Sequence, residues 1–345
     1  RAVPTQLKTA IGVGIGLFLM IIGLVDAGFV RRIPDAAGTT VPVELGLGGK
    51  LTTWPVFVFC VGLLITLVLF VRKVKGAILI GILVSTVLAV IVEAIAKVGP
   101  SFVDGKPNPA GWSLNVPALP DKIVDLPDLS LLGKFNVLDS WDRAGWLVVL
   151  MFIFTLLITD FFDTMGTMVA VGQEGDLLDS EGMPPRTKEI LLVDSVAAAA
   201  GGAASVSSNT SFIESASGVA EGARTGVANL VTGVLFLLAM FLAPLVTMVP
   251  FEAASTALVV VGFLMITAVR QIDWTDYEIA IPAFLAITLM PFTYSISNGI
   301  GAGIISYVVI KVAVGKAREV HPLLYGVAVL FVLYFLRGPL ESVLL

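Results

Sequence analysis

The chain has little charge and almost no cysteine or histidine. Asp, Glu, Lys and Arg make up 14% of its 345 residues, against about 25% in soluble domains, and the mean hydropathy is +0.98. The single cysteine, Cys60, excludes an intramolecular disulfide, and zinc or haem motif spacings are absent. No basic stripe lies outside the short loops, so a nucleic-acid partner is not expected. The composition points to a protein that lives in a lipid bilayer.

Long apolar runs fill most of the sequence. About 20 consecutive apolar residues are enough to cross a bilayer as an α-helix. The sequence therefore predicts an all-α polytopic membrane protein, with apolar runs at 7–25, 54–71, 76–95, 145–171, 189–204, 214–223, 226–249, 253–269, 277–293, 296–314 and 321–336. Alternation puts the C-terminus outside unless one of the last three runs is re-entrant, and the sequence leaves this open.

Basic residues in short loops indicate the orientation, because cytoplasmic loops are enriched in Lys and Arg. Arg72, Lys73 and Lys75 fill the turn between the second and third runs. Segment 96–142, rich in Pro, Asp and Gly, is then an external loop. Other basic residues fall at ends on the same predicted cytoplasmic side: Arg186, Lys188, Arg224, Arg270, Lys311, Lys316 and Arg318.

Acidic residues inside apolar runs are the exceptions that indicate a site. A carboxylate at bilayer depth costs about 3 kcal/mol unless it faces protein or water. The stretch TDFFDTMGTM places Asp160, Asp163, Thr164 and Thr167 at i, i+3, i+4 and i+7, on one helix face. We expect Asp163 to line a buried polar site. The alternative, that Asp160 or Asp163 caps a helix or pairs with a basic residue, stays open.

A second acid, Glu214, follows a polar stretch in SSNTSFIESASG. Its Ser, Asn and Thr residues suit an extended segment shielded by protein, which is tolerated at membrane depth only around a cavity. Glu214 would then begin a half-helix, where the helix dipole favours negative charge. Broken helices of this kind build the substrate sites of many secondary transporters. The alternative is a surface loop with an ordinary capping glutamate.

Together these residues fit a polar heterocyclic ligand. A carboxylate accepts two adjacent N–H donors, such as those on the edge of a purine or pyrimidine. Backbone N–H groups and the hydroxyls of Thr210 and Ser211 would read ring nitrogens and carbonyls, and Phe212 would stack on the ring. A second buried acid can carry a proton, because burial favours the neutral form of a carboxyl group.

Other classes of function have less support. No nucleophile–base pair or metal cluster supports an embedded enzyme, and no polar stripe repeats over several runs as a channel would require. Tyr294, Ser295, Ser297 and Asn298 are polar residues within apolar sequence. They form either a gate or a seam of hydrogen bonds between helices, and we favour the seam.

Four blocks resemble the azaguanine-type purine permeases, the adenine/guanine/hypoxanthine branch of the nucleobase–cation symporter-2 family. They are DFFDTMGTMVAVGQEGDLLDSEG, NTSFIESASGVAEGARTG, IDWTDYEIAIPAF and MPFTYSISNGI. The resemblance covers nearly the whole chain. It implies inverted seven-span repeats, with gate-domain helices in 1–95 and 250–345, an external loop at 96–142, and core substrate-binding helices in 143–249.

The resemblance also implies roles for single residues. Asp163 and Glu214 would contact the base or its coupled proton, with Asp160 a weaker neighbour in proton coupling. Asn209–Ile213 would be a short strand before the broken helix. Thr167 lies where uracil-type relatives carry a histidine, which favours the purine branch.

Phe212 stands where relatives commonly have a tyrosine, which leaves its role open. The expected substrate-binding set is Glu214, Asp163, Thr167, Phe212, Thr210 and Ser211.

The activity implied by the resemblance is import of hypoxanthine, guanine or adenine by proton symport across the cell membrane. Protons would be the coupling ion, with no other cofactor and no metal. Xanthine, urate or uracil on the same fold is the alternative. By the resemblance the chain begins at the fifth span, so we expect four spans upstream of Arg1. Whether two copies associate through the gate domain is left open.

Overall fold

The computed structural model describes residues 3–32, 42–103, 105–136, 139–179, 182–212 and 214–336. Within these ranges it is mainly helical, which confirms the predicted all-α membrane class. In the described part of the chain, seven helices are long and apolar enough to cross a bilayer: Thr5–Asp26, Trp54–Val71, Ala77–Ala96, Val148–Val169, Val227–Val246, Phe251–Gln271 and Ile296–Ala313. Two shorter apolar helices follow the same pattern, Tyr277–Phe292 and Pro322–Phe335.

The elements follow the predicted apolar runs closely. The helices are α1 (Thr5–Asp26), α2 (Trp54–Val71), α3 (Ala77–Ala96), α4 (Asp139–Ala144), α5 (Trp146–Glu174), α6 (Thr187–Ala203), α7 (Ser215–Ala220), α8 (Val227–Ala239), α9 (Ala243–Val246), α10 (Phe251–Ile266), α11 (Tyr277–Phe292), α12 (Ile296–Ala313) and α13 (Pro322–Phe335). Short 3₁₀ turns are η2 (Met240–Leu242), η3 (Thr267–Gln271) and η4 (Ala317–Glu319). Two antiparallel hairpins pair β1 (Val30–Arg32) with β2 (Val43–Leu45), and β3 (Phe102–Val103) with β4 (Lys106–Pro107).

The chain forms two compact units, which are described separately. The first unit comprises Arg1–Phe18, Leu129–Ala223 and Leu264–Leu345, and the second comprises Leu19–Asp128 and Arg224–Phe263. The candidate site residues all belong to the first unit.

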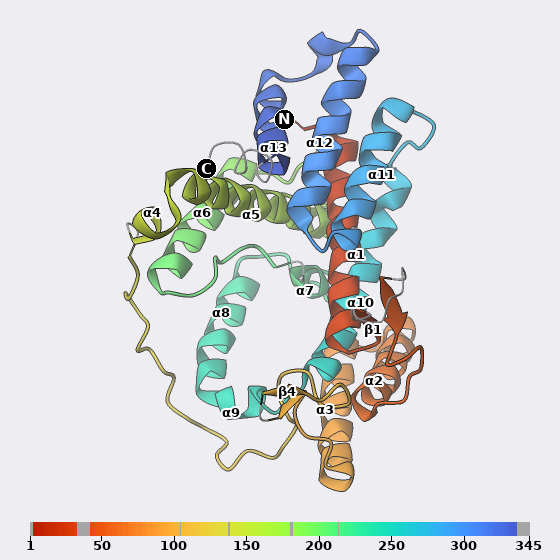
Figure 1. Cartoon of the computed structure of the whole chain (residues 1–345), viewed down its shortest axis with the longest axis vertical. Helices are drawn as coiled ribbons and strands as arrows, with labels where there is room; N and C mark the ends of the chain where they lie inside the picture. The colour runs from red at the N-terminus through yellow and green to blue at the C-terminus, as the bar shows by residue number, and fades with distance from the viewer. Residues whose placement is uncertain are drawn as a thin grey trace. The chain divides into compact units, whose positions relative to one another are not determined.

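In the first unit, α11 and α12 lie side by side as an antiparallel hairpin (Figure 1). Small residues allow this close approach, as is usual between membrane helices. A Cβ atom on Gly299 would overlap the Met290 side chain and lie 2.7 Å from the carbonyl oxygen of Ala286. Both Met290 and Ala286 are fully buried. The hairpin is therefore a tightly packed pair.

Helix α13 packs on α12 and also touches α5. The Phe331 ring is buried, and it meets the Phe154 ring of α5 edge to face at 5.5 Å. A Cβ atom on Gly301 of α12 would lie 2.6 Å from Phe331, so the glycine makes room for the ring. These contacts join α5 to the α11–α12 hairpin.

Ion pairs hold the ends of α11 and α12 that were predicted to be cytoplasmic. Lys311 lies 2.7 Å from Glu278 and 2.8 Å from Glu319, and Lys316 lies 2.5 Å from Glu278. The hydrogen bond to Glu278 raises the pKa of Lys316. The buried ammonium of Lys311 is thus satisfied by two carboxylates.

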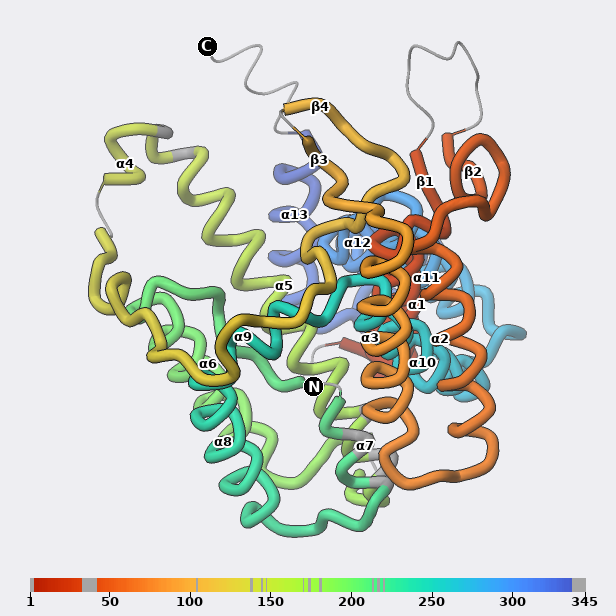
Figure 2. Tube along the Cα trace, turned by 90° about the horizontal axis from the view of Figure 1, so that it is seen from below, coloured from red at the N-terminus to blue at the C-terminus, as the bar shows by residue number. Residues whose placement is uncertain are grey.

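In the second unit, α2 and α3 run side by side in both views (Figure 1, Figure 2). Gly62 faces Ser85, and Gly81 faces Thr66. The Thr66 hydroxyl donates to the Gly62 carbonyl at 2.8 Å, and the Ser85 hydroxyl donates to the Gly81 carbonyl at 2.7 Å. Each hydroxyl is satisfied within its own helix, so the contact between α2 and α3 needs no water.

Part of the predicted external loop is docked onto the second unit rather than extended away from it. Trp112 is fully buried, and its indole N–H donates to Glu93 of α3 at 2.7 Å. Ser113 donates to Glu252 of α10 from its backbone N–H at 3.0 Å and from its hydroxyl at 2.9 Å. Glu252 is 1% exposed. Two carboxylates therefore anchor the loop, an arrangement not predicted from the sequence.

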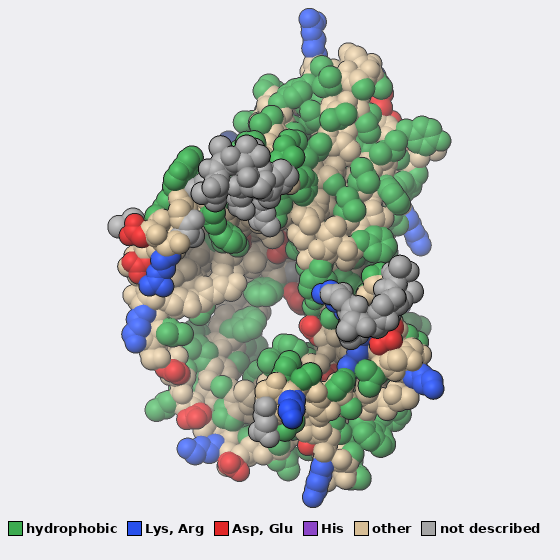
Figure 3. Space-filling model, in the orientation of Figure 1, with side chains coloured by type: hydrophobic (Ala, Val, Ile, Leu, Met, Phe, Trp, Pro, Cys, Tyr) green, Lys and Arg blue, Asp and Glu red, His purple; other side chains and the backbone are tan. Residues whose placement is uncertain are grey.

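The outward faces of the helices are apolar. Figure 3 shows hydrophobic side chains over the region of α11 and α12, in agreement with exposed residues such as Ile281, Phe284 and Val309. In a soluble protein such a surface would aggregate, whereas in a bilayer it faces lipid chains. The protein is therefore a multi-pass membrane protein.

Substituting alanine for Gly299 tests the packing of the hairpin. The added methyl meets the backbone of α11, which cannot move as a flexible side chain can, so we expect a loss of about 2 kcal/mol in stability. The measurement is the apparent melting temperature in detergent. Gly326→Ala in α13 is the matched control, because nothing lies within 4 Å of its Cβ position. Equal melting temperatures for the two variants would contradict the packing described.

Candidate functional site

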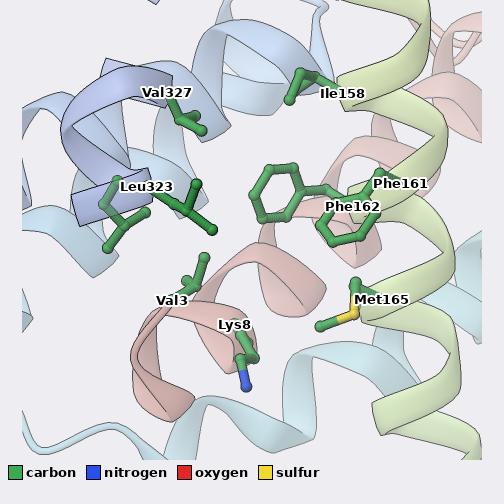
Figure 4. Close-up of a pocket in the computed structure, with 9 residues that line it drawn as sticks. Val3, Lys8, Ile158, Phe161, Phe162, Met165, Leu323 and Val327 are labelled. Carbon is green, nitrogen blue, oxygen red and sulfur yellow. The ribbon is translucent and has the colours of Figure 1, made fainter. Parts of the chain in front are cut away.

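Helix α5 has two chemically distinct faces. Ile158, Phe161, Phe162 and Met165 line an apolar cavity of about 200 Å³ (Figure 4). The polar face of α5 carries Asp160, Asp163, Thr164 and Thr167. These residues follow the pattern of the cavity residues two positions later in the sequence, which corresponds to a rotation of about 200° around a helix. The cavity and the polar face therefore lie on opposite sides of α5.

The cavity does not suit a polar heterocycle. Apart from Lys8 its other lining residues are aliphatic: Val3, Leu323, Leu324 and Val327. The Lys8 amine points away from the rings of Phe161 and Phe162 (Figure 4) and lies 3.2 Å from the Met183 sulfur. A base placed there would lose its hydrogen bonds to water without replacement. The polar face of α5 is the better candidate.

Hydroxyl groups link this polar face to residues 207–212, here called the polar segment. The Thr164 hydroxyl of α5 lies 3.3 Å from that of Thr210, which lies 3.4 Å from an oxygen of Asp163. Thr210 has one hydroxyl hydrogen for two acceptors. Among the described residues, Asp163 is therefore held by one long and shared hydrogen bond, so its carboxylate has capacity left for another donor.

Asp194 of α6 is the central acceptor of this network, and it was missed in the sequence analysis. It accepts the Thr164 hydroxyl at 2.8 Å, the Ser211 backbone N–H at 3.1 Å and the Ser211 hydroxyl at 3.3 Å. It is 8% exposed. Its signal was present in the sequence, because LLVDSVAAAAGG places an acid in an apolar run, as with Asp163.

Asp160 binds the beginning of the polar segment. It accepts the Ser208 hydroxyl at 2.6 Å, and the Asn209 amide donates to the Ala197 carbonyl at 3.2 Å. Asp160 thus has a hydroxyl partner and a role in holding the segment. Together with Asp194 it ties the segment to α5 and α6.

The short strand predicted at Asn209–Ile213 is not formed in its described part. Residues 207–212 are neither helix nor strand, and Ile213 lies outside the described residues. A strand needs its backbone N–H groups to bond to a neighbouring strand, and here the Ser211 backbone N–H donates to Asp194 of α6 instead. The predicted broken helix follows as α7, which packs against α5.

Glu214 and Phe212 are exposed residues beside the network. Glu214 directly precedes α7 and is exposed, and Asp160, Asp194 and Glu214 all lie within electrostatic range of Asp163. The Phe212 ring is 61% exposed, so a planar ligand can reach it. Thr167 is buried one turn beyond Asp163. The structure thus gathers four acids, and their mutual repulsion favours binding of hydrogen-bond donors or protons.

Comparison with known proteins identifies the family of the chain. A model of the Permease family matches residues 1–302. The chain belongs to the Permease family. As a family member it is a transporter and not an enzyme, and the predicted resemblance is confirmed.

Three relatives of this permease illustrate the similarity. The guanine/hypoxanthine permease PbuG of Bacillus subtilis is 38% identical over 336 residues, covering 97% of this chain and 69% of the relative. The adenine permease AdeP of Escherichia coli is 35% identical over 338 residues, covering 96% and 67%. The guanine/hypoxanthine permease PbuO of Bacillus subtilis is 38% identical over 333 residues, covering 96% and 70%.

Substituting asparagine for Asp194 tests its role in the permease. The variant keeps one acceptor oxygen for three donors, and hydrogen bonds to a charged acceptor contribute about 1.5–3 kcal/mol each. We expect faster amide hydrogen exchange in residues 207–212, measured by mass spectrometry. The control is Ser195→Ala, because Ser195 bonds only to Leu191 of its own helix. Unchanged exchange in the Asp194 variant would contradict the anchoring role.

Proposed function

We propose that the protein imports purine nucleobases, namely hypoxanthine, guanine or adenine, across the cell membrane by proton symport. The relatives named guanine/hypoxanthine and adenine permeases support the substrate class. The observation that carries the proposal is the network of α5, α6 and the polar segment. In it the Asp163 carboxylate, bonded to Thr210, keeps capacity for a further donor, and Phe212, two residues along the segment from Thr210, has an exposed aromatic ring. We also propose that residues 143–249 form the substrate-binding core and that the helices in 1–95 and 250–345 form the gate.

The acids account for selectivity towards bases that present N–H groups. Glu214 accepts two adjacent N–H donors of the base, and Phe212 stacks on its ring. Thr210 and Ser211 contact ring nitrogens or carbonyls. Thr167, buried one helical turn after Asp163, packs beneath the site. An anionic substrate would be repelled by Asp160, Asp163, Asp194 and Glu214 together. A neutral purine instead supplies donors to carboxylates that would otherwise repel one another.

The same charge density provides a reason for proton coupling. Bringing a base against Asp163 removes water from a carboxylate that already faces three others. Neutralising Asp163 with a proton lowers that cost, so base and proton bind together more readily than either alone. Asp160, already bonded to Ser208, is the weaker partner in this coupling.

Substituting glutamine for Glu214 tests base recognition. The glutamine amide keeps the shape of the side chain, but its NH₂ group is a donor and faces a base that also presents donors. Loss of a charged hydrogen bond costs about 1.5–3 kcal/mol, or about 10- to 100-fold in affinity. Uptake of labelled hypoxanthine, guanine or adenine in a host lacking purine uptake should fall at least about 10-fold.

The control for this experiment is Glu221→Gln, which changes a neighbouring acid beyond α7. It should transport at the normal rate. Normal uptake by the Glu214 variant would remove Glu214 from the site. If unlabelled xanthine, urate or uracil competed better than hypoxanthine against the unchanged protein, the proposed substrate class would be wrong.

Substituting asparagine for Asp163 tests proton coupling. Asparagine resembles the protonated acid, so uptake should lose its increase at acidic external pH, measured as initial rates from acidic to alkaline medium. The control is Asp273→Asn. Hydrogen bonds from Thr275 lower the pKa of Asp273, so this carboxylate stays ionised and its replacement should leave the pH profile unchanged. A pH profile in the Asp163 variant that matches the unchanged protein would exclude Asp163 as the proton carrier.

A further inference from the structure

The turn between α11 and α12 has an unusual backbone. Tyr294 has φ +51, in the left-handed region where glycine is the usual residue. Its N–H bonds to the Pro291 carbonyl at 3.3 Å, and the Ser295 N–H bonds to the Met290 carbonyl at 3.0 Å. This pattern is a Schellman motif with a tyrosine in the glycine position. A bulky residue held in this region is strained.

The turn nevertheless has one defined conformation, because both of its helices hold it. The Ser295 side chain caps α12 by accepting the Asn298 N–H at 3.4 Å. Gly299, one turn further along α12, packs against Met290 and Ala286 of α11. The tip of the hairpin is therefore held by contacts from both α11 and α12.

The hairpin tip contacts α5, here called the substrate helix because it carries Asp160 and Asp163. The Ser297 hydroxyl lies 2.6 Å from the Thr159 hydroxyl of α5. Ser297 is 5% exposed, so this hydrogen bond is shielded from competing water. Thr159 precedes Asp163 by four residues, which places it on the same face one turn, about 6 Å, away. It also directly precedes Asp160.

We propose that the Thr159–Ser297 hydrogen bond is a latch between the α11–α12 hairpin and the substrate helix, and that it opens in each transport cycle. The proposal rests on the proposed transport function. A transporter must expose its site to one side and then to the other, so contacts of the substrate helix either move with it or break. A single hydrogen bond between two neutral hydroxyls is weak enough to break in every cycle.

The strained turn supports a latch over simple packing. Strain of this kind persists where the surrounding structure holds it and is concentrated at functional and switching sites. The Thr159–Ser297 hydrogen bond is itself a seam between helices of the kind favoured from the sequence, and the strained turn at Tyr294 is the feature that points from a static seam to a latch. The strained turn presents a buried hydroxyl to the residue beside two acids of the site. Ser297 and Thr159 are thus positioning residues for the substrate helix.

A reversible cross-link tests the latch. The two hydroxyl oxygens lie 2.6 Å apart, so the side chains at positions 159 and 297 point towards each other, as a disulfide between them requires. We would introduce Thr159→Cys and Ser297→Cys together in a Cys60→Ala background, which removes the natural thiol. Disulfide-linked peptides are quantified by mass spectrometry, and hypoxanthine uptake is measured before oxidation, after oxidation and after reduction. The two single-cysteine variants are controls for oxidation alone.

We expect oxidation to reduce uptake by the double variant at least about 10-fold, equivalent to more than about 1.4 kcal/mol, and reduction to restore it. Complete cross-linking with unchanged uptake would overturn the latch while leaving the proposed transport intact. Absence of hypoxanthine, guanine and adenine uptake by the unaltered protein would instead overturn the proposed function and, with it, the latch.

Labelling of the Ser297→Cys single variant gives an independent test should the double variant fail to fold. A buried thiol reacts slowly with a water-soluble maleimide, and opening of the latch during transport would expose it. We expect hypoxanthine to increase the labelling rate at least about 3-fold, equivalent to more than about 0.6 kcal/mol. Ser306→Cys is the matched control, because Ser306 bonds only to carbonyls of α12 itself. A labelling rate at position 297 that hypoxanthine does not change would overturn the latch.

Discussion

Carboxylates within an apolar bundle must find their hydrogen-bond donors inside the protein, and this requirement organises the first unit. Asp194 meets it with three donors from Thr164 and Ser211, and Asp160 meets it with Ser208. These bonds draw an otherwise irregular segment across α5 and α6. Among the described residues, Asp163 is the exception, with one long shared bond to Thr210. The neighbouring acids thus differ in the hydrogen-bond donors that the protein supplies to them, and Asp163, which has the weakest, is left to bind a ligand.

The sequence indicated the parts of the site that depend on local pattern. Helix bounds followed from apolar runs, and the spacing of Asp160, Asp163 and Thr164 placed them on one face, where the structure has them. The short helix after Glu214 also followed from the polar interruption before it. Each of these features is set by residues close together in the chain.

The features that were missed depend on contacts between distant residues. Asp194 lies 30 residues from Thr164, and no periodicity relates the two. The predicted strand at Asn209–Ile213 is absent from its described part because α6 competes for its polar groups. Likewise, Ser113 reaches Glu252 across 139 residues. In each case the fold brings a polar group to an acid from a distant part of the chain, and a single sequence does not show which distant residues come together.

Transport as proposed requires a base to bind at the polar face of α5 rather than in the apolar cavity on its other side. The most direct test is an experimental structure of the protein with bound hypoxanthine. We expect the base to lie against Phe212, with its N–H edge on the carboxylate of Glu214 and with Asp163 within hydrogen-bond distance. A base bound between Phe162 and Leu323, in the apolar cavity, would contradict it.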